Sequence, residues 1–250
     1  MAEKMKKYMT PFQWAECLAI IAFTIYFALT NTTDTWWYIL IDSLAAVCGV
    51  FCVVLCAGGK KSQYYWGFVN IAAYIVIALI NKYYGEVMLN GLYYLPTQFI
   101  GLYVWGKHYN KPKDQVEGLR MDGKHIAVWS ACSVAGIFVY KMILDALGGN
   151  ATLLDSMSTV FSLVANVLMV MRYREQWALW IIVDVVTVVM WVIAGDFLMT
   201  AMWAIYLINA VYGWIMWTKM SRETGMEASC FSDQPVRKQN QDEQGRISYG

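Results

Sequence analysis

The ten residues from Trp177 to Val186, "WALWIIVDVV", hold one acidic side chain, Asp184, in an otherwise apolar run. A carboxylate is costly in hydrocarbon, so Asp184 must face protein, water or a ligand. The apolar run does not alternate and is longer than a barrel strand, which predicts a membrane-spanning helix. On such a helix Trp177, Trp180 and Asp184 share a face, because residues three and four apart are neighbours.

The composition of the whole chain indicates a membrane protein. Of its 250 residues, 59% are hydrophobic and only 15% are charged, whereas soluble domains carry about 25% charge. The net charge of +1 favours no nucleic-acid partner. Two histidines flank one polar loop, and Cys48, Cys52 and Cys56 follow one helix face as small packing residues. Neither group has metal-ligand spacing, so we expect no metal and no cofactor.

Eight apolar stretches reach or approach the length of about 20 residues that a membrane span needs. The chain is therefore predicted to be an all-α membrane protein with about eight transmembrane helices. Glu16 makes the first span the weakest, and we expect this side chain near the membrane interface. The predicted spans are Pro11–Thr30, Trp36–Cys56, Gln63–Ile80, Val87–Gly106, Ile126–Leu144, Ala151–Met171, Trp177–Ala194 and Phe197–Thr218.

The basic residues predict the orientation. With eight spans, all of the 19 lysines and arginines except Lys82 and Lys141 fall on one side of the membrane. Basic loops are typically cytoplasmic. We therefore expect a multi-pass protein of the cell inner (plasma) membrane with cytoplasmic N- and C-termini. From Ser221 onward the chain is polar without apolar periodicity, which predicts a disordered tail.

The two halves of the chain resemble each other. Three pairs of segments match at offsets of 112 to 114 residues: "DSLAAVCGVFCVVL" from Asp42 with "DSMSTVFSLVANVLM" from Asp155, "WGFVN" from Trp66 with "WIIVD" from Trp180, and "YYLPTQFIGLYVWGK" from Tyr93 with "IYLINAVYGWIMWTK" from Ile205. Three spans per half, joined by one more, give a parallel 3+1+3 repeat after one N-terminal span. Such a repeat with polar residues at equivalent depths favours a transporter with a central site.

The repeat and the loops divide the chain into five predicted parts. These are a cytoplasmic N-terminus with the first span (1–35), the first three-helix repeat (36–107), a cytoplasmic loop and linker helix (108–150), the second three-helix repeat (151–218) and the cytoplasmic tail (219–250).

The repeat also brings candidate site residues together. Asn70 and Asp184 occupy matching positions, each four residues after a tryptophan. No basic residue lies deep in a span, so Asp184 must be protonated, solvated in a cavity or matched by a cationic ligand. Nearby aromatic faces suit a flat cation, at about 0.5–2 kcal/mol per contact. The predicted substrate-binding residues are Trp66, Asn70, Tyr94, Gln98, Trp177, Trp180, Asp184, Tyr206 and Asn209.

Several of these polar and aromatic side chains have structural alternatives. Trp177 is equally typical of an aromatic belt at the membrane interface, and Trp105 and Trp217, near span ends, fit that belt better than a site. Gln98 and Asn209 are also typical of hydrogen bonds between packed helices. Pro96 interrupts the backbone ladder beside Gln98, so we expect a kink or a free carbonyl there.

Two segments resemble one known family. "MRYREQWALWIIVDVVTVV" (Met171–Val189) and "NGLYYLPTQFIGLYVWGKHY" (Asn90–Tyr109) are similar to the nicotinamide riboside transporter family, PnuC, over roughly Asp42 to Trp217. The resemblance implies a fold related to the SWEET sugar carriers and uptake of nicotinamide riboside by facilitated diffusion with alternating access. It also implies trapping of the cargo by a cytosolic riboside kinase, and assembly as a homotrimer. Trp177, Trp180 and Asp184 match the family's second-half motif, and Gln98 lies in the matching first-half helix. In the first half Gln63 stands where the motif has Trp177.

Other functions stay open on the sequence. Thiamine is also a flat cation, and relatives of the family carry it or riboflavin, so another vitamin is the alternative cargo. From other classes, a ligand sensor that does not transport and an intramembrane enzyme are the rivals. No paired-carboxylate, histidine or metal motif supports an enzyme, and no GxxxxGK[ST] motif supports ATP-driven transport.

Overall fold

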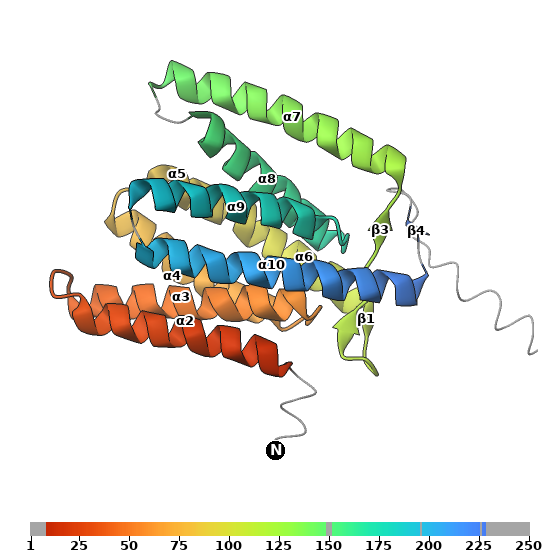
Figure 1. The fold of residues 1–250 in the computed structure, drawn as a ribbon, viewed down its shortest axis with the longest axis horizontal. Coiled ribbons are helices and arrows are strands. Elements are labelled where there is room, and N and C mark those ends of the chain that lie inside the picture. Colours follow the sequence, from red (N-terminus) through yellow and green to blue (C-terminus); the bar gives the residue numbers. More distant parts are fainter. Residues whose placement is uncertain (1–8, 149–151, 196, 226, 229–250) are drawn as a thin grey trace, which may run out of the picture.

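The computed structural model describes residues 9–148, 152–195, 197–225 and 227–228. Within these ranges, seven helices are long and apolar enough to cross a membrane. They form one bundle, in which α2 and α7 lie at opposite edges (Figure 1). The helices are α2 (Pro11–Thr30), α3 (Trp36–Ala57), α4 (Gln63–Ile80), α7 (Gly123–Ala146), α8 (Thr152–Val170), α9 (Gln176–Ala194) and α10 (Phe197–Thr224).

The fourth predicted span forms three consecutive segments instead of one regular helix. These are α5 (Tyr84–Met88), the π-helix η1 (Leu89–Tyr94) and α6 (Leu95–Lys107). Pro96 lies in the first turn of α6, and the backbone N–H of Leu95 bonds to Asn90 O across the π turn. Proline lacks the N–H that would continue an α-helical ladder, so the irregularity falls just before it. The all-helical prediction is confirmed, with this span as its irregular member.

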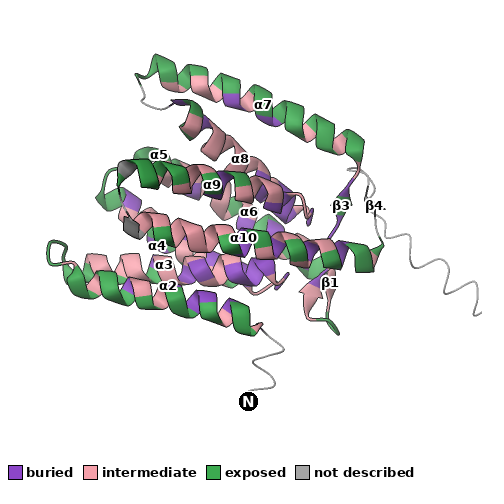
Figure 2. Cartoon of the chain, in the orientation of Figure 1, coloured by how far each residue is buried: buried purple, intermediate pink, exposed green. Residues whose placement is uncertain are grey.

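The helix contacts follow the predicted repeat. In the first half α3 packs on α4 and α4 on α6; in the second half α8 packs on α9 and α9 on α10. The two halves meet through α3 with α10 and through α6 with α8, which are equivalent contacts in a parallel repeat. The linker helix α7 packs on α8, and α2 packs mainly on α3. Most of the outward surface of α2 and α7 is exposed (Figure 2), and its side chains are largely apolar, as lipid contact requires.

Two tryptophans join the halves by equivalent hydrogen bonds. The indole N–H of Trp105 on α6 donates to Met169 O on α8 at 3.0 Å, and that of Trp217 on α10 donates to Cys56 O on α3 at 3.0 Å. Both side chains are fully buried. The expectation that they belong to an interfacial belt is therefore wrong: each lies between the halves, where the other half supplies its acceptor.

Glu16 is buried within the protein, which leaves its predicted depth near the membrane interface as a prediction. Its side chain is 6% exposed on the buried face of α2. Helix α2 begins with a capping box formed by Thr10 and Gln13, and Pro11 occupies the first helical position between them.

The polar loop after α6 connects the same end of both halves. Short strands β1 (Tyr109–Asn110) and β2 (Gln115–Val116) form a hairpin, and β3 (Arg120–Met121) pairs with β4 (Glu227–Ala228). The N–H of Val116 donates to Gly59 O, and that of Leu119 donates to Arg172 O, each at 2.8 Å. Gly59 and Arg172 follow equivalent helices and share a φ of 67°. The loop segment 116–119 thus bridges the two repeats.

Helix α10 extends to Thr224, beyond the predicted end of the span at Thr218. The Thr224 hydroxyl donates to Gly118 O in the bridging loop at 2.9 Å, which gives this last turn a partner. The first residues of the predicted tail, up to Thr224, are therefore helical, and residues 229–250 lie outside the described residues.

Replacing Trp105 or Trp217 with phenylalanine tests the bonds between the halves. Each substitution keeps most of the apolar ring but removes the donor, so we expect each to cost about 1 kcal/mol of unfolding free energy. Thermal unfolding in detergent measures this cost, with Trp36→Phe as the control because Trp36 is 77% exposed. Equal destabilisation by all three variants would contradict a special role for the two buried indoles.

Candidate functional site

A cavity of about 490 Å³ lies between the two halves of the bundle. Its walls come from α3 and α4, from the irregular fourth span, and from α8, α9 and α10. All but one of the predicted site residues line it: Asn70, Tyr94, Gln98, Trp177, Trp180, Asp184, Tyr206 and Asn209. Residues from both halves thus meet at one place, as a central site between repeats requires.

Trp66 is the predicted site residue that does not line the cavity. Its ring stacks on Phe51, with ring centroids 4.7 Å apart, and packs against a separate apolar cluster. The sequence alignment of the two halves pairs Trp66 with Trp180 because the residues around them are similar. The packing of side chains in the two halves gives a different residue-by-residue correspondence between them.

In the structure, the residues of α4 and α9 that occupy equivalent places are shifted by one residue from those that the sequence repeat pairs. Their first residues, Gln63 and Gln176, are both fully buried. The next residues are also alike: the Tyr64 ring covers Gly101, and the Trp177 ring covers Gly213. In this register Asp184 corresponds to Ile71 rather than to Asn70. The acidic side chain therefore has an apolar counterpart, and the two halves differ chemically at this position.

Asp184 lies on the cavity wall with 5% of its surface exposed. Among the described residues it forms no salt bridge. The lining contains a second carboxylate, Glu86, but no lysine, arginine or histidine. Low-dielectric walls strengthen the field of such charges, so the cavity favours a cationic ligand.

Hydrogen-bonding atoms without a protein partner also line the cavity. Three amide oxygens are buried and unpaired within the described chain: Gln98 Oε1, Asn166 Oδ1 and Asn209 Oδ1. Two buried indole N–H groups, of Trp177 and Trp203, are likewise unpaired there. A buried polar group without a partner is costly. These atoms provide acceptors and donors for hydroxyl or amide groups of a ligand.

The backbone holds some of these amides in place. Asn70 Nδ2 donates to Ala45 O at 2.8 Å, and Asn209 Nδ2 donates to Val53 O at 3.4 Å. The Gln98 amide lies against Gly67, where an added Cβ would come within 2.6 Å of Nε2. Gly67 therefore leaves the space that Gln98 occupies.

An aromatic cluster adjoins the cavity through Trp177, which lines it. Tyr64, Trp105, Trp177 and Trp217 pack edge to face or tilted, with centroid separations of 5.2 Å, 5.5 Å and 6.4 Å along the series Tyr64–Trp105–Trp217–Trp177. All four are at most 3% exposed. The lining also includes Glu86 and Tyr74, and Tyr74 is 41% exposed. The cavity therefore extends from a buried aromatic cluster to exposed residues.

Sequence reasoning missed several lining residues, notably Tyr74, Glu86, Asn90 and Trp203. A signal for two of them is present in the sequence, because Glu86, Asn90, Tyr94 and Gln98 are each four residues apart. That spacing is typical of one helix face. Glu86 lies just before the predicted span Val87–Gly106, so it was not among the polar residues predicted to lie inside the membrane.

The chain matches the profile of the nicotinamide mononucleotide transporter family over residues 39–219. It is 39% identical over 197 residues to the nicotinamide riboside transporter PnuC of Neisseria mucosa, covering 75% of this chain and 73% of that protein. The PnuC of Haemophilus influenzae is 31% identical over 210 residues, covering 83% and 90%. A crystal structure of the vitamin B3 transporter PnuC superposes with a TM-score of 0.69 at 35% identity, covering 86% of this chain and 93% of that one.

Replacing Gly213 with alanine tests the packing that positions Trp177. The added Cβ would lie 2.6 Å from the indole ring, so either the ring moves or the helices separate. We expect a loss of about 1–3 kcal/mol in unfolding free energy, as for other overpacked sites, together with a changed near-ultraviolet circular dichroism spectrum. Gly85→Ala is the matched control, since nothing lies within 4 Å of its Cβ position. A Gly213→Ala protein that unfolds at the wild-type temperature would refute this packing role.

Proposed function

This chain belongs to the PnuC family of membrane transporters, and from that membership we propose that it carries nicotinamide riboside across the membrane. It is a multi-pass membrane transporter and not an enzyme. The single observation that supports the cargo best is the buried, unpaired Asp184 in a cavity lined by tryptophans and free amide oxygens.

The cavity chemistry distinguishes two cargoes named among the matches. The family profile refers to the mononucleotide, whereas the relatives are named for the riboside. The mononucleotide adds a phosphate, which proteins usually bind with arginine, lysine or helix N-termini. The lining has two carboxylates and no basic side chain. Repulsion of a phosphate therefore favours the riboside as cargo.

The proposed roles follow from the chemical groups of the cargo. Asp184 attracts the positive pyridinium ring, and the faces of Trp177 and Trp180 stack on it. The oxygens of Gln98 and Asn209 accept hydrogen bonds from the carboxamide and the ribose hydroxyls. Tyr94 and Tyr206 line the path beside them, and Asn70 completes the polar wall.

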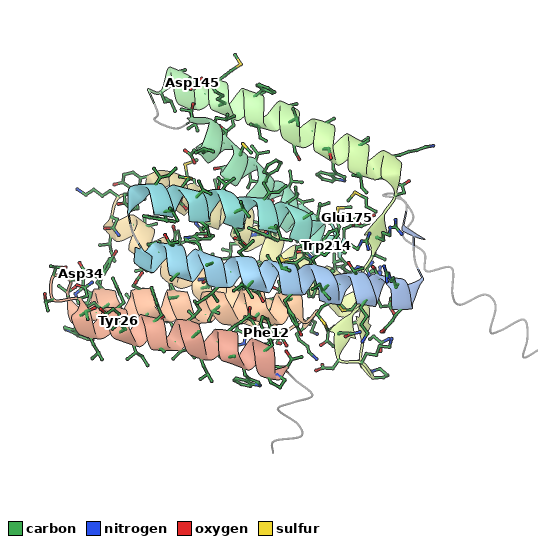
Figure 3. The ribbon with its side chains drawn as sticks, in the orientation of Figure 1. Phe12, Tyr26, Asp34, Asp145, Glu175 and Trp214 are labelled. Atoms are coloured by element: carbon green, nitrogen blue, oxygen red, sulfur yellow. The ribbon has the colours of Figure 1, made fainter. Side chains whose placement is uncertain are left out.

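The proposed orientation follows from the basic loops, which place the aromatic cluster on the cytoplasmic side. In Figure 3, Asp34 and Asp145 mark the opposite, outer end of the bundle, and Glu175 lies toward the cytoplasmic one. The cavity then reaches the exterior, and the cluster must separate before cargo enters the cell. We propose facilitated diffusion by this alternating access, with a cytosolic riboside kinase trapping the cargo. Assembly as a homotrimer is a further proposal from the family resemblance.

Counterflow of nicotinamide riboside in proteoliposomes tests the function. Wild-type protein is expected to exchange the riboside, and Asp184→Asn to bind it at least about tenfold more weakly, because the charge pair with the cargo is lost. Asp34→Asn is the matched control, since Asp34 is an exposed outer carboxylate away from the cavity. Riboside binding without exchange would indicate a sensor instead, and exchange of thiamine alone would change the cargo.

The energy source is tested in the same vesicles without kinase. Facilitated diffusion predicts that riboside equilibrates to equal concentrations inside and outside, and that an uncoupler leaves the initial rate unchanged. Accumulation that persists with the membrane potential clamped at zero, and collapses when the proton gradient is dissipated, would instead require proton coupling.

A further inference from the structure

A second carboxylate lies on the cavity wall, far along the chain from Asp184. Glu86 is in the first turn of α5 and is half-buried, in contrast to the 5% exposure of Asp184. Within the described chain it forms no salt bridge, and its one side-chain hydrogen bond is a long one, 3.4 Å from Asn90 Nδ2. Water solvates such a carboxylate, so its negative charge costs little where it stands.

A stripe of polar side chains connects this carboxylate to the centre of the cavity. Glu86, Asn90, Tyr94 and Gln98 follow at intervals of four residues, and all four line the cavity. One member of the stripe is held by the backbone, since Asn90 Nδ2 donates to Glu86 O at 2.9 Å. At the inner end, Gln98 Oε1 is buried and has no partner in the described chain. A ligand that enters at Glu86 therefore meets polar groups along its whole path.

We propose that Glu86 is the residue that captures the cationic cargo at the outer mouth, before the cargo moves on to Asp184. The inference rests on the proposed function and orientation. Two negative charges in one low-dielectric cavity, without a basic residue in the lining, raise the local concentration of cations. Glu86, half-exposed, supplies long-range attraction and gives up its ligand easily. Asp184, buried and unpaired, supplies the tighter site.

A purely structural role for Glu86 makes a different prediction. An acidic residue in the first turn of a helix interacts favourably with the helix dipole. If that were its whole contribution, Glu86→Gln would lower the thermal stability and reduce transport of every cargo alike. Capture instead acts only on charged cargo and weakens with salt.

The test measures initial riboside uptake into right-side-out membrane vesicles at low and high ionic strength. We expect Glu86→Gln to raise the half-saturation concentration on the order of tenfold at low salt, with the maximal rate unchanged. Near 1 M salt the difference should shrink to about twofold or less, because the screening length falls to about 3 Å. Glu86→Asp keeps the charge and should stay near wild type, and Asp34→Asn is the control for an outer carboxylate outside the cavity.

An uncharged cargo provides the second measurement. The dihydropyridine form of the riboside keeps the ribose and carboxamide but has no ring charge, so Glu86→Gln should leave its half-saturation concentration unchanged. An effect that is equal for both forms, independent of salt, or matched by Asp34→Asn would overturn the capture role. If wild-type vesicles take up thiamine instead of the riboside, the proposed cargo fails. The same salt series with thiamine then decides on Glu86 separately.

Discussion

The reciprocal indole bonds of Trp105 and Trp217 are the constraint on which the rest of the architecture depends. Each carries a donor from the third helix of one half to a carbonyl in the first helix of the other, at the same distance of 3.0 Å. Both bonds lie at the same end of the bundle, and the two residues that accept them, Met169 and Cys56, also line the cavity. The bonds that join the halves therefore also hold part of the cavity wall in place.

The charge of the cavity follows from a different constraint. A bilayer tolerates a buried carboxylate only where something compensates it. In the described chain, neither Asp184 nor Glu86 has a basic partner. The compensation that the protein does not provide is available from a cationic ligand, and the same arrangement disfavours an anion. In the proposed function, selectivity would thus depend as much on the lack of arginine and lysine in the described lining as on the aromatic rings.

The sequence was sufficient to predict seven of the eight spans, the repeated order of the helices and the acidic residue in the cavity, because apolar length and uncompensated charge are local properties. It did not predict which tryptophans face inward. Trp105 and Trp217 resemble belt residues by their place near span ends, and only tertiary contacts show that each bonds across the repeat. Trp66 was misassigned because letters matched one residue away from the packing register. Glu86 was missed because it lies one residue before the predicted span. In the structure α5 and the π-helix that follows it bring Glu86 to the cavity.

The correspondence of Asp184 with Ile71 bears on how an elongated molecule lies between the halves. A cavity with true two-fold symmetry would accept such a molecule in two reversed poses of equal energy. Here the same register pairs Trp180 with Gly67, so one wall offers a ring and an acid where the other offers neither. The repeat encloses a central space, and the chemical difference between its halves makes the two reversed poses unequal in energy. A molecule with one charged end then has one preferred pose across the axis that relates the halves, with its charge nearer Asp184 than Ile71.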